Sequence, residues 1–217
     1  MKQILFILCS IVFAVSVKAQ SIGTLHNAAL DSILLKFENS PATFDRLYDY
    51  AAEYASRRNV TLPARSSVKA YAAQFVINKG YAEMLQAARA ANMVSPPVMT
   101  YMEKVTAEAE RLPDPGADGI YKLLNSMTSS REYVNLSRTD KTIAANFNDA
   151  LGKSYELWST NDTRRKCGVK CFICMALVDA FWASIPPPNP ILGAIMSAIS
   201  RCCGCGSCSG NVNCNFT

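Results

Sequence analysis

Three cysteines near the C-terminus have a spacing that could hold a metal cluster. Cys167, Cys171 and Cys174 follow the pattern C-x3-C-x2-C, which can ligate an iron–sulfur cluster. An enzyme built on that motif needs most of a barrel after it, and only 43 residues follow Cys174. We therefore interpret the spacing as a coincidence and predict no cluster.

A disulfide framework is the better interpretation of these cysteines. Eight lie between residues 167 and 214, and none lies between residues 20 and 166. In an exported chain, an even and clustered set predicts up to four disulfides, whose pairing the sequence does not decide. The predicted disulfide residues are Cys167, Cys171, Cys174, Cys202, Cys203, Cys205, Cys208 and Cys214.

Zinc is the rival ligand for the same segment. Cys202, Cys203, Cys205 and Cys208 are dense enough for a thiolate site. Export and the even number favour disulfides, so we predict no metal site.

Catalytic motifs are missing from the rest of the sequence. There is no G-x-S-x-G, H-E-x-x-H or P-loop pattern. His26 is the single histidine, and we expect it on a helix face or in solvent. Trp158 and Trp182 are expected to be core or interface anchors. The sequence predicts no enzyme and no cofactor.

The N-terminus has the features of an export signal. A positive start is followed by an apolar run from Ile4 to Val17 and by Val17-Lys18-Ala19, which fits a cleavage site. A membrane anchor is the alternative, but the run of about 14 residues is shorter than the ~20 needed to span a bilayer. We expect residues 1–19 to be a signal peptide and the mature chain to be secreted or extracytoplasmic.

The remaining 198 residues are enough for one domain and a small module. Half of the chain is hydrophobic and 18% is charged, which favours a packed core. The formal net charge of +5 is mild and no basic stripe is present, so no nucleic-acid partner is predicted.

The chain between Ile22 and Trp158 shows helical periodicity. Apolar residues recur at 3.6-residue spacing in four stretches, and Ser95-Pro96 and Ser137 with Asp140 resemble helix starts. These patterns predict an antiparallel bundle of five or six helices. The stretches are Phe44–Ala55, Val68–Val76, Val98–Leu112 and Ile143–Trp158.

A second, apolar part follows a polar segment. Phe172 to Ser200 holds one charged residue, Asp179, and residues 186–190 read PPPNP, which no continuous helix can contain. We predict an all-α chain: a helical bundle at 20–160, a basic linker at 161–166 that is either a solvated connection or a protease site, and a disulfide-rich helical hairpin module at 167–217.

The apolar hairpin needs a partner. Each arm is too short to span a bilayer, and a module of about 50 residues cannot bury that much apolar surface within itself. It must dock on the bundle, on a protein partner or on a membrane surface. Five basic residues against two acidic ones around the hairpin give a local balance of +3, which suits anionic lipid. The oligomeric state is not predicted.

This layout resembles that of halocin-type bacteriocin precursors, on the export signal, the cysteine-free helical region and the segment from Cys167 to Cys214. The resemblance implies that the C-terminal peptide is a toxin or antimicrobial, and that the upstream part is an immunity protein. Residues 20–166 would then mask the hairpin until cleavage. The alternative is an unprocessed secreted binding or structural protein, in which the cysteine-rich module caps the bundle.

Overall fold

The described part of the chain is almost entirely helical. The computed structural model describes residues 20–36, 42–77, 79–160, 169–185, 189–203 and 214–215. Apart from turns and loops, two strands of two residues each are the other elements within these ranges, so the predicted all-α class is confirmed. The predicted signal peptide (1–19) and linker (161–166) lie outside the described residues.

The first part of the chain holds eight of the described helices. They are α2 (Ile22–Leu35), α3 (Phe44–Ser56), α4 (Arg65–Phe75), α5 (Tyr81–Ala90), α6 (Pro96–Glu110), α7 (Gly116–Met127), α8 (Arg131–Val134) and α9 (Arg138–Thr160). The second part adds α10 (Val169–Ser184) and α11 (Pro190–Cys203). The expectation of five or six helices before residue 160 was therefore too low.

Local chemistry explains where these helices begin. Ser95 caps α6 by accepting a hydrogen bond from the Val98 amide at 3.4 Å, and Pro96 occupies the first turn. Asp140 N donates to Ser137 Oγ at 3.1 Å at the start of α9, as the sequence indicated. The side chain of Asn189 accepts from the amides of Ile191 and Leu192, which fixes the start of α11 after the proline segment.

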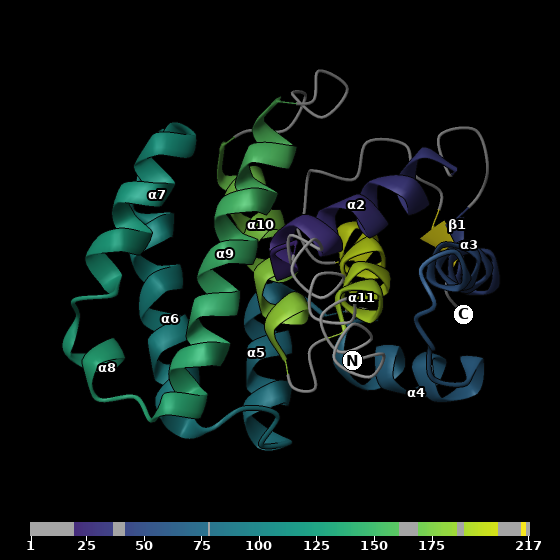
Figure 1. Ribbon diagram of the computed structural model, residues 1–217, viewed down its shortest axis with the longest axis horizontal. Coiled ribbons are helices and arrows are strands. Elements are labelled where there is room, and N and C mark those ends of the chain that lie inside the picture. Colours follow the sequence, from purple (N-terminus) through teal and green to yellow (C-terminus); the bar gives the residue numbers. More distant parts are fainter. Residues whose placement is uncertain are drawn as a thin grey trace, which may run out of the picture.

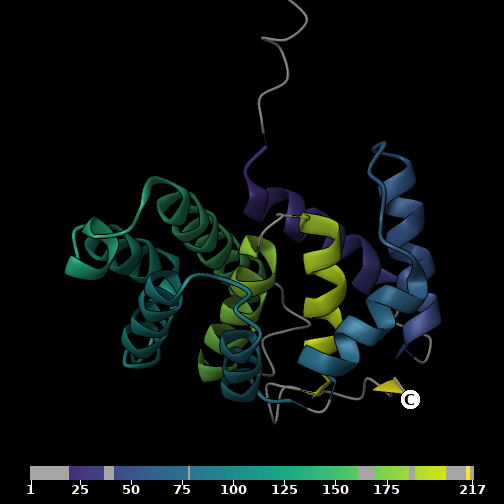
Figure 2. The ribbon, with the colours of Figure 1, turned by 90° about the horizontal axis from the view of Figure 1, so that it is seen from below.

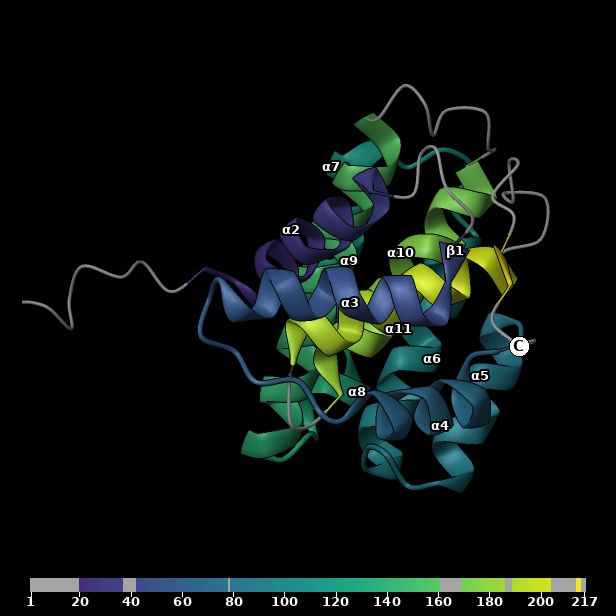
Figure 3. The same ribbon diagram turned by 90° about the vertical axis from the view of Figure 1, so that its right-hand side faces the viewer.

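The predicted hairpin lies in the middle of the fold. Figure 1 and Figure 2 show α10 and α11 between α6, α7 and α9 on one side and α3 and α4 on the other. Helix α10 packs most extensively against α9 and also against α11, α2 and α6, whereas α11 packs on α2, α10 and α3. Figure 3 shows α3 crossing α11. Buried side chains of both parts belong to one hydrophobic cluster.

A short backbone pairing ties the far end of the chain to its beginning. Strands β1 (Ala42–Thr43) and β2 (Cys214–Asn215) run parallel, with Ala42 opposite Cys214 and Thr43 opposite Asn215. Strand β2 therefore lies beside the start of α3.

Close helix contacts depend on small residues. A Cβ on Gly23 of α2 would lie 2.8 Å from the Cα of Ala150 on α9. One on Gly193 of α11 would lie 3.0 Å from the carbonyl oxygen of Trp182 on α10. Because these two residues have no Cβ, the backbone of α2 can pack closely against α9, and that of α11 against α10.

Candidate functional site

Helix α10 is enclosed on every side from Met175 to its C-terminal end. Each residue from Met175 to Ile185 is buried, as is each residue of α11 from Gly193 to Ser200. A helix that is apolar all round belongs either in a protein core or in a membrane. In this chain the neighbouring helices α2, α6, α9 and α11 supply most of the cover, and α4 adds to it at Trp182.

A polar cluster interrupts this apolar surround at one level. The indole Nε1 of Trp158 on α9 donates to Asp179 Oδ2 on α10 at 2.8 Å. His26 on α2 places Nε2 3.1 Å from Ser197 Oγ on α11. Hydrogen bonds of the cluster thus join the N-terminal helices to both arms of the hairpin.

Two further side chains hold His26 in place. His26 Nδ1 lies 3.1 Å from Asn27 Oδ1, and the same oxygen accepts a 2.8 Å hydrogen bond from the Ser154 hydroxyl of α9. His26 and Ser154 are both 0% exposed. His26 therefore lies on a helix face, which was one of the two expectations, and the solvent alternative is wrong, because α2 turns this face toward α9 and α11.

Burial dominates the electrostatics of Asp179. Burial raises the pKa of its carboxyl above the ordinary value, and His26, Trp158, Ser197 and Ser154 offset part of that rise. These four side chains come from α2, α9 and α11.

The cluster contains the residue types of a nucleophile and its base. A serine hydroxyl within hydrogen-bond distance of an imidazole is the arrangement that activates nucleophilic serines. Here Ser197 is 3% exposed, Asp179 is 2% exposed and His26 is fully buried, so a substrate has no access to the pair. What the cluster does in this structure is connect four helices.

A group of aromatic side chains from α10 and α4 lies around Trp182. Trp182 makes edge contacts with Tyr71 and Phe75 of α4, at centroid distances of 5.8 and 6.4 Å, and with Phe181 at 5.1 Å. Both tryptophans are buried, as the sequence predicted. The buried Nε1 of Trp182 has no hydrogen-bond partner among the described residues, a state that costs about 1–3 kcal/mol.

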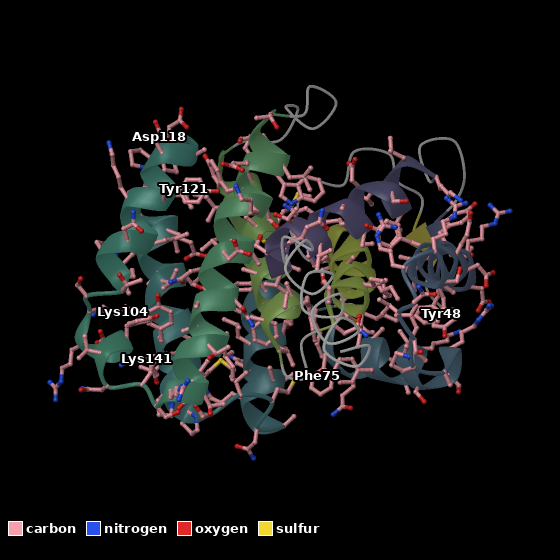
Figure 4. The ribbon with its side chains drawn as sticks, in the orientation of Figure 1. Tyr48, Phe75, Lys104, Asp118, Tyr121 and Lys141 are labelled. Carbon is pink, nitrogen blue, oxygen red and sulfur yellow. The ribbon has the colours of Figure 1, made fainter. Side chains whose placement is uncertain are left out.

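The outer faces of the described helices carry ion pairs. Arg65 of α4 bonds Asp45 at 3.2 Å and also Asp49, and its guanidinium lies over the ring of Tyr48. Figure 4 shows Tyr48 beside α3 and Tyr121 between α7 and α9, on opposite sides of the molecule. These exposed pairs contribute little to stability.

The predicted disulfide residues are described only in part. Cys174 is disulfide-bonded, and its partner is outside the side chains that the structure describes. Cys167, Cys205 and Cys208 lie outside the described residues, as do the side chains of Cys171, Cys202, Cys203 and Cys214. Across the described ranges there is no group of three or more residues that could bind a metal ion. Within the same ranges, none of the helices has the length and apolar character needed to cross a bilayer.

Sequence reasoning missed the polar cluster as a site. His26 and Ser197 are 171 residues apart along the chain, so no local pattern could pair them. One signal was available: Asp179 is the sole charge between Phe172 and Ser200, and a lone charge in an apolar helix requires partners.

Comparison with protein-family models, with curated proteins and with solved structures finds no match to this chain.

Proposed function

We propose that this chain is a secreted precursor whose N-terminal helices sheathe an apolar, cysteine-stapled hairpin, and that the hairpin acts on membranes after its release. The observation that carries the proposal is the enclosure of α10: a helix that is apolar on every side lies inside a cover made by α2, α6, α9 and α11. Without α2, α6 and α9, the apolar surface of α10 would need another apolar environment to cover it.

The composition of the hairpin supports a lipid surface as that apolar environment. Apart from Asp179, the residues from Phe172 to Ser200 are uncharged. Basic residues stand at both ends, at 164–166, Lys170 and Arg201, where they would meet anionic headgroups. Trp182 adds an indole, a side chain enriched at membrane interfaces.

The cysteines support a stapled module. All eight cysteines of the predicted mature chain lie after residue 166, so disulfides among them would leave no covalent link to residues 20–166 once the chain is cut. A cut in the basic segment 161–166 would then sever the covalent connection between the hairpin and residues 20–160, while the ends of the hairpin stay clamped by its disulfides.

One observation favours a second candidate, an unprocessed secreted binding or structural protein. The hairpin shares one hydrophobic cluster with the N-terminal helices, and β2 pairs with β1. A segment so deeply packed fits a permanent core as well as a masked one.

The intact mass of the secreted product distinguishes the two. Under denaturing, non-reducing conditions, the precursor reading expects a fragment that begins within residues 162–167. A single species at the mass of residues 20–217 supports the unprocessed protein instead.

The membrane step is tested on the released, oxidised fragment. It should bind vesicles that contain anionic lipid, and Ile195→Lys should weaken binding more than Lys170→Ala, because Ile195 is on the apolar face of α11 and is 0% exposed in the intact chain. A fragment that stays in the aqueous phase at low salt refutes the membrane role.

A further inference from the structure

The intact fold leaves two polar atoms of the hairpin unmatched. The indole Nε1 of Trp182 on α10 and the hydroxyl of Ser200 on α11 are buried, and neither has a hydrogen-bond partner within the part of the chain that the structure describes. The third such atom among the described side chains is the hydroxyl of Tyr54 on α3. Buried polar groups in native proteins are nearly always hydrogen-bonded, so these exceptions call for an explanation.

The two tryptophans of the chain differ in this respect. Trp158, on the N-terminal side, donates to Asp179 at 2.8 Å. Trp182 is covered by α4, where the rings of Tyr71 and Phe75 meet it edge-on at centroid distances of 5.8 and 6.4 Å. Helix α4 therefore covers the ring of Trp182 with aromatic surface but provides no acceptor for its N–H.

A lipid surface has one layer in which this indole would be fully satisfied. Tryptophan is enriched at the boundary between headgroups and hydrocarbon, because its ring is apolar and its N–H is polar. Oxygens of the headgroups and water accept hydrogen bonds there, whereas the centre of a bilayer contains no acceptor. The boundary thus supplies what both the intact chain and the bilayer centre lack.

The position of Trp182 along the hairpin determines what this means for orientation. A Cβ on Gly193 would lie 3.0 Å from the carbonyl oxygen of Trp182, so Trp182 lies near the turn, against the beginning of α11. Lys170 and Arg201 lie at the other end, in the first turn of α10 and the last turn of α11.

The length of α10 separates two ways of meeting a bilayer. Lys170 and Trp182 are 12 residues apart on this helix, or ~18 Å, and half of the hydrocarbon core is ~15 Å thick. A hairpin that entered turn first, with Lys170 at the headgroups, would bring Trp182 to the middle of the bilayer. A hairpin that lies along the surface keeps both residues at the boundary.

We infer that Trp182 anchors the released hairpin at the headgroup boundary of a lipid surface, so that the hairpin lies along this surface and does not enter it turn first. The inference rests on the proposed membrane activity and adds the orientation of the hairpin. Helix α4 covers the anchor in the intact chain, and separation from α4 exposes it. Asp179 is three residues before Trp182 and therefore on the same side of α10, so this orientation also brings its carboxyl to the polar layer.

The test measures the depth of Trp182 in vesicles of phosphatidylcholine and phosphatidylglycerol. It uses the oxidised mature chain (20–217) with Trp158→Phe, which leaves Trp182 as the sole tryptophan, and with residues 161–166 replaced by the recognition sequence of a site-specific protease. The chain is cut in the presence of vesicles, which are then floated. The emission of Trp182 should shift to the blue. Lipids brominated near the headgroup should quench it more strongly than lipids brominated near the chain ends.

The variant Trp182→Phe separates the N–H from the ring. With Trp158 retained and the chain cut, it should lower the partition into vesicles about two- to tenfold, the effect of one hydrogen bond. The matched control is Phe181→Leu, which changes the neighbouring buried ring on α10 without removing a donor and should lower the partition less. Flotation of the wild-type chain, cut in the same way, is the reference.

The uncut chain gives a readout that does not depend on lipid. Trp182→Phe removes an unmatched donor, whereas Trp158→Phe makes the same change of ring and breaks a hydrogen bond. The midpoint of denaturant unfolding should therefore fall less in Trp182→Phe than in Trp158→Phe. Circular dichroism checks that each variant is folded.

The outcomes separate the inference from the function on which it rests. If the hairpin floats and bromine near the chain ends quenches Trp182 most, the hairpin enters turn first; the inference is then overturned and the membrane activity stands. Equal partition of Trp182→Phe and wild type, or equal loss of stability in the two tryptophan variants, also overturns the anchoring role. If the cut wild-type chain does not float at any proportion of phosphatidylglycerol, the proposed function falls together with the orientation.

Discussion

The hydrogen bond from Trp158 to Asp179 can be tested by replacing each partner with an apolar residue. Trp158→Phe removes the indole donor, whose bond spans 2.8 Å between α9 and α10, and leaves the buried carboxyl with one partner fewer. A hydrogen bond to an ionisable group is worth about 1.5–3 kcal/mol. The smaller ring also leaves a void beside a side chain that is 1% exposed, which adds about 1 kcal/mol.

The reverse change, Asp179→Leu, leaves the indole N–H without an acceptor in the same place. Each single variant should therefore lose about 2–4 kcal/mol of the free energy of unfolding. The double variant leaves neither an orphaned donor nor an orphaned carboxyl at this bond. It should be more stable than the sum of the two losses predicts, by about 1.5–3 kcal/mol.

Denaturant unfolding followed by circular dichroism measures all four proteins, since the midpoint and slope give the free energy of unfolding. Trp158→Phe combined with Asp118→Asn is the matched control, because Asp118 is exposed on α7; its effects should add within about 0.5 kcal/mol. If Trp158→Phe and Asp179→Leu also add, the bond does not couple α9 to α10. The argument that the cluster holds the hairpin in place would then be refuted.

Three further results are expected. Gly23→Ala should destabilise the chain by about 1–3 kcal/mol because its Cβ would meet the backbone of Ala150. Gly80→Ala should be tolerated, because the nearest atom to its Cβ would lie 3.8 Å away. Equal unfolding midpoints for the two variants would contradict this prediction. Burial raises the pKa of Asp179 in the folded chain, so its contribution to the free energy of unfolding is full below the unfolded pKa and is lost as the pH rises through the folded pKa; Asp179→Asn should flatten that decline, and a profile that matches wild type would refute it. Thiol titration of the denatured, unreduced secreted protein should find no free thiol, and stoichiometric release of zinc would reverse the assignment of the cysteines.

The periodicity of apolar residues predicted the helices well where the helices are amphipathic. The stretches at Phe44–Ala55 and Ile143–Trp158 correspond to α3 and α9, and their apolar residues are mostly buried. The predicted number of helices was too low because short helices leave little periodic signal. Helix α8 has four residues, and α4 and α5 are separated by a turn that ends at Gly80, which the pattern alone did not identify as a break.

The position of the hairpin could not be derived from the sequence. Periodicity indicates which face of a helix packs against other elements. Helix α10 has no polar face, so its sequence does not show which of its sides faces the rest of the protein. Its lone charge showed that a partner was needed without showing which one. The partners Trp158 and His26 come from α9 and α2, and their meeting depends on how four helices pack.

The central place of α10 has a consequence for how the two parts depend on each other. Helix α2 packs on α9, α10 and α11, and its fully buried residues Leu30 and Ile33 face this shared interior. Residues 20–160 alone would therefore leave apolar surface of α2 and α9 open to water, just as the detached hairpin would leave α10 open. Because each part covers the other, separating them costs the burial of both surfaces at once. A cut between residues 161 and 166 is then insufficient by itself to free the hairpin in water. The proposed release would therefore need a second apolar environment for α10, and the proposal assigns that role to a lipid surface because of the composition of the hairpin.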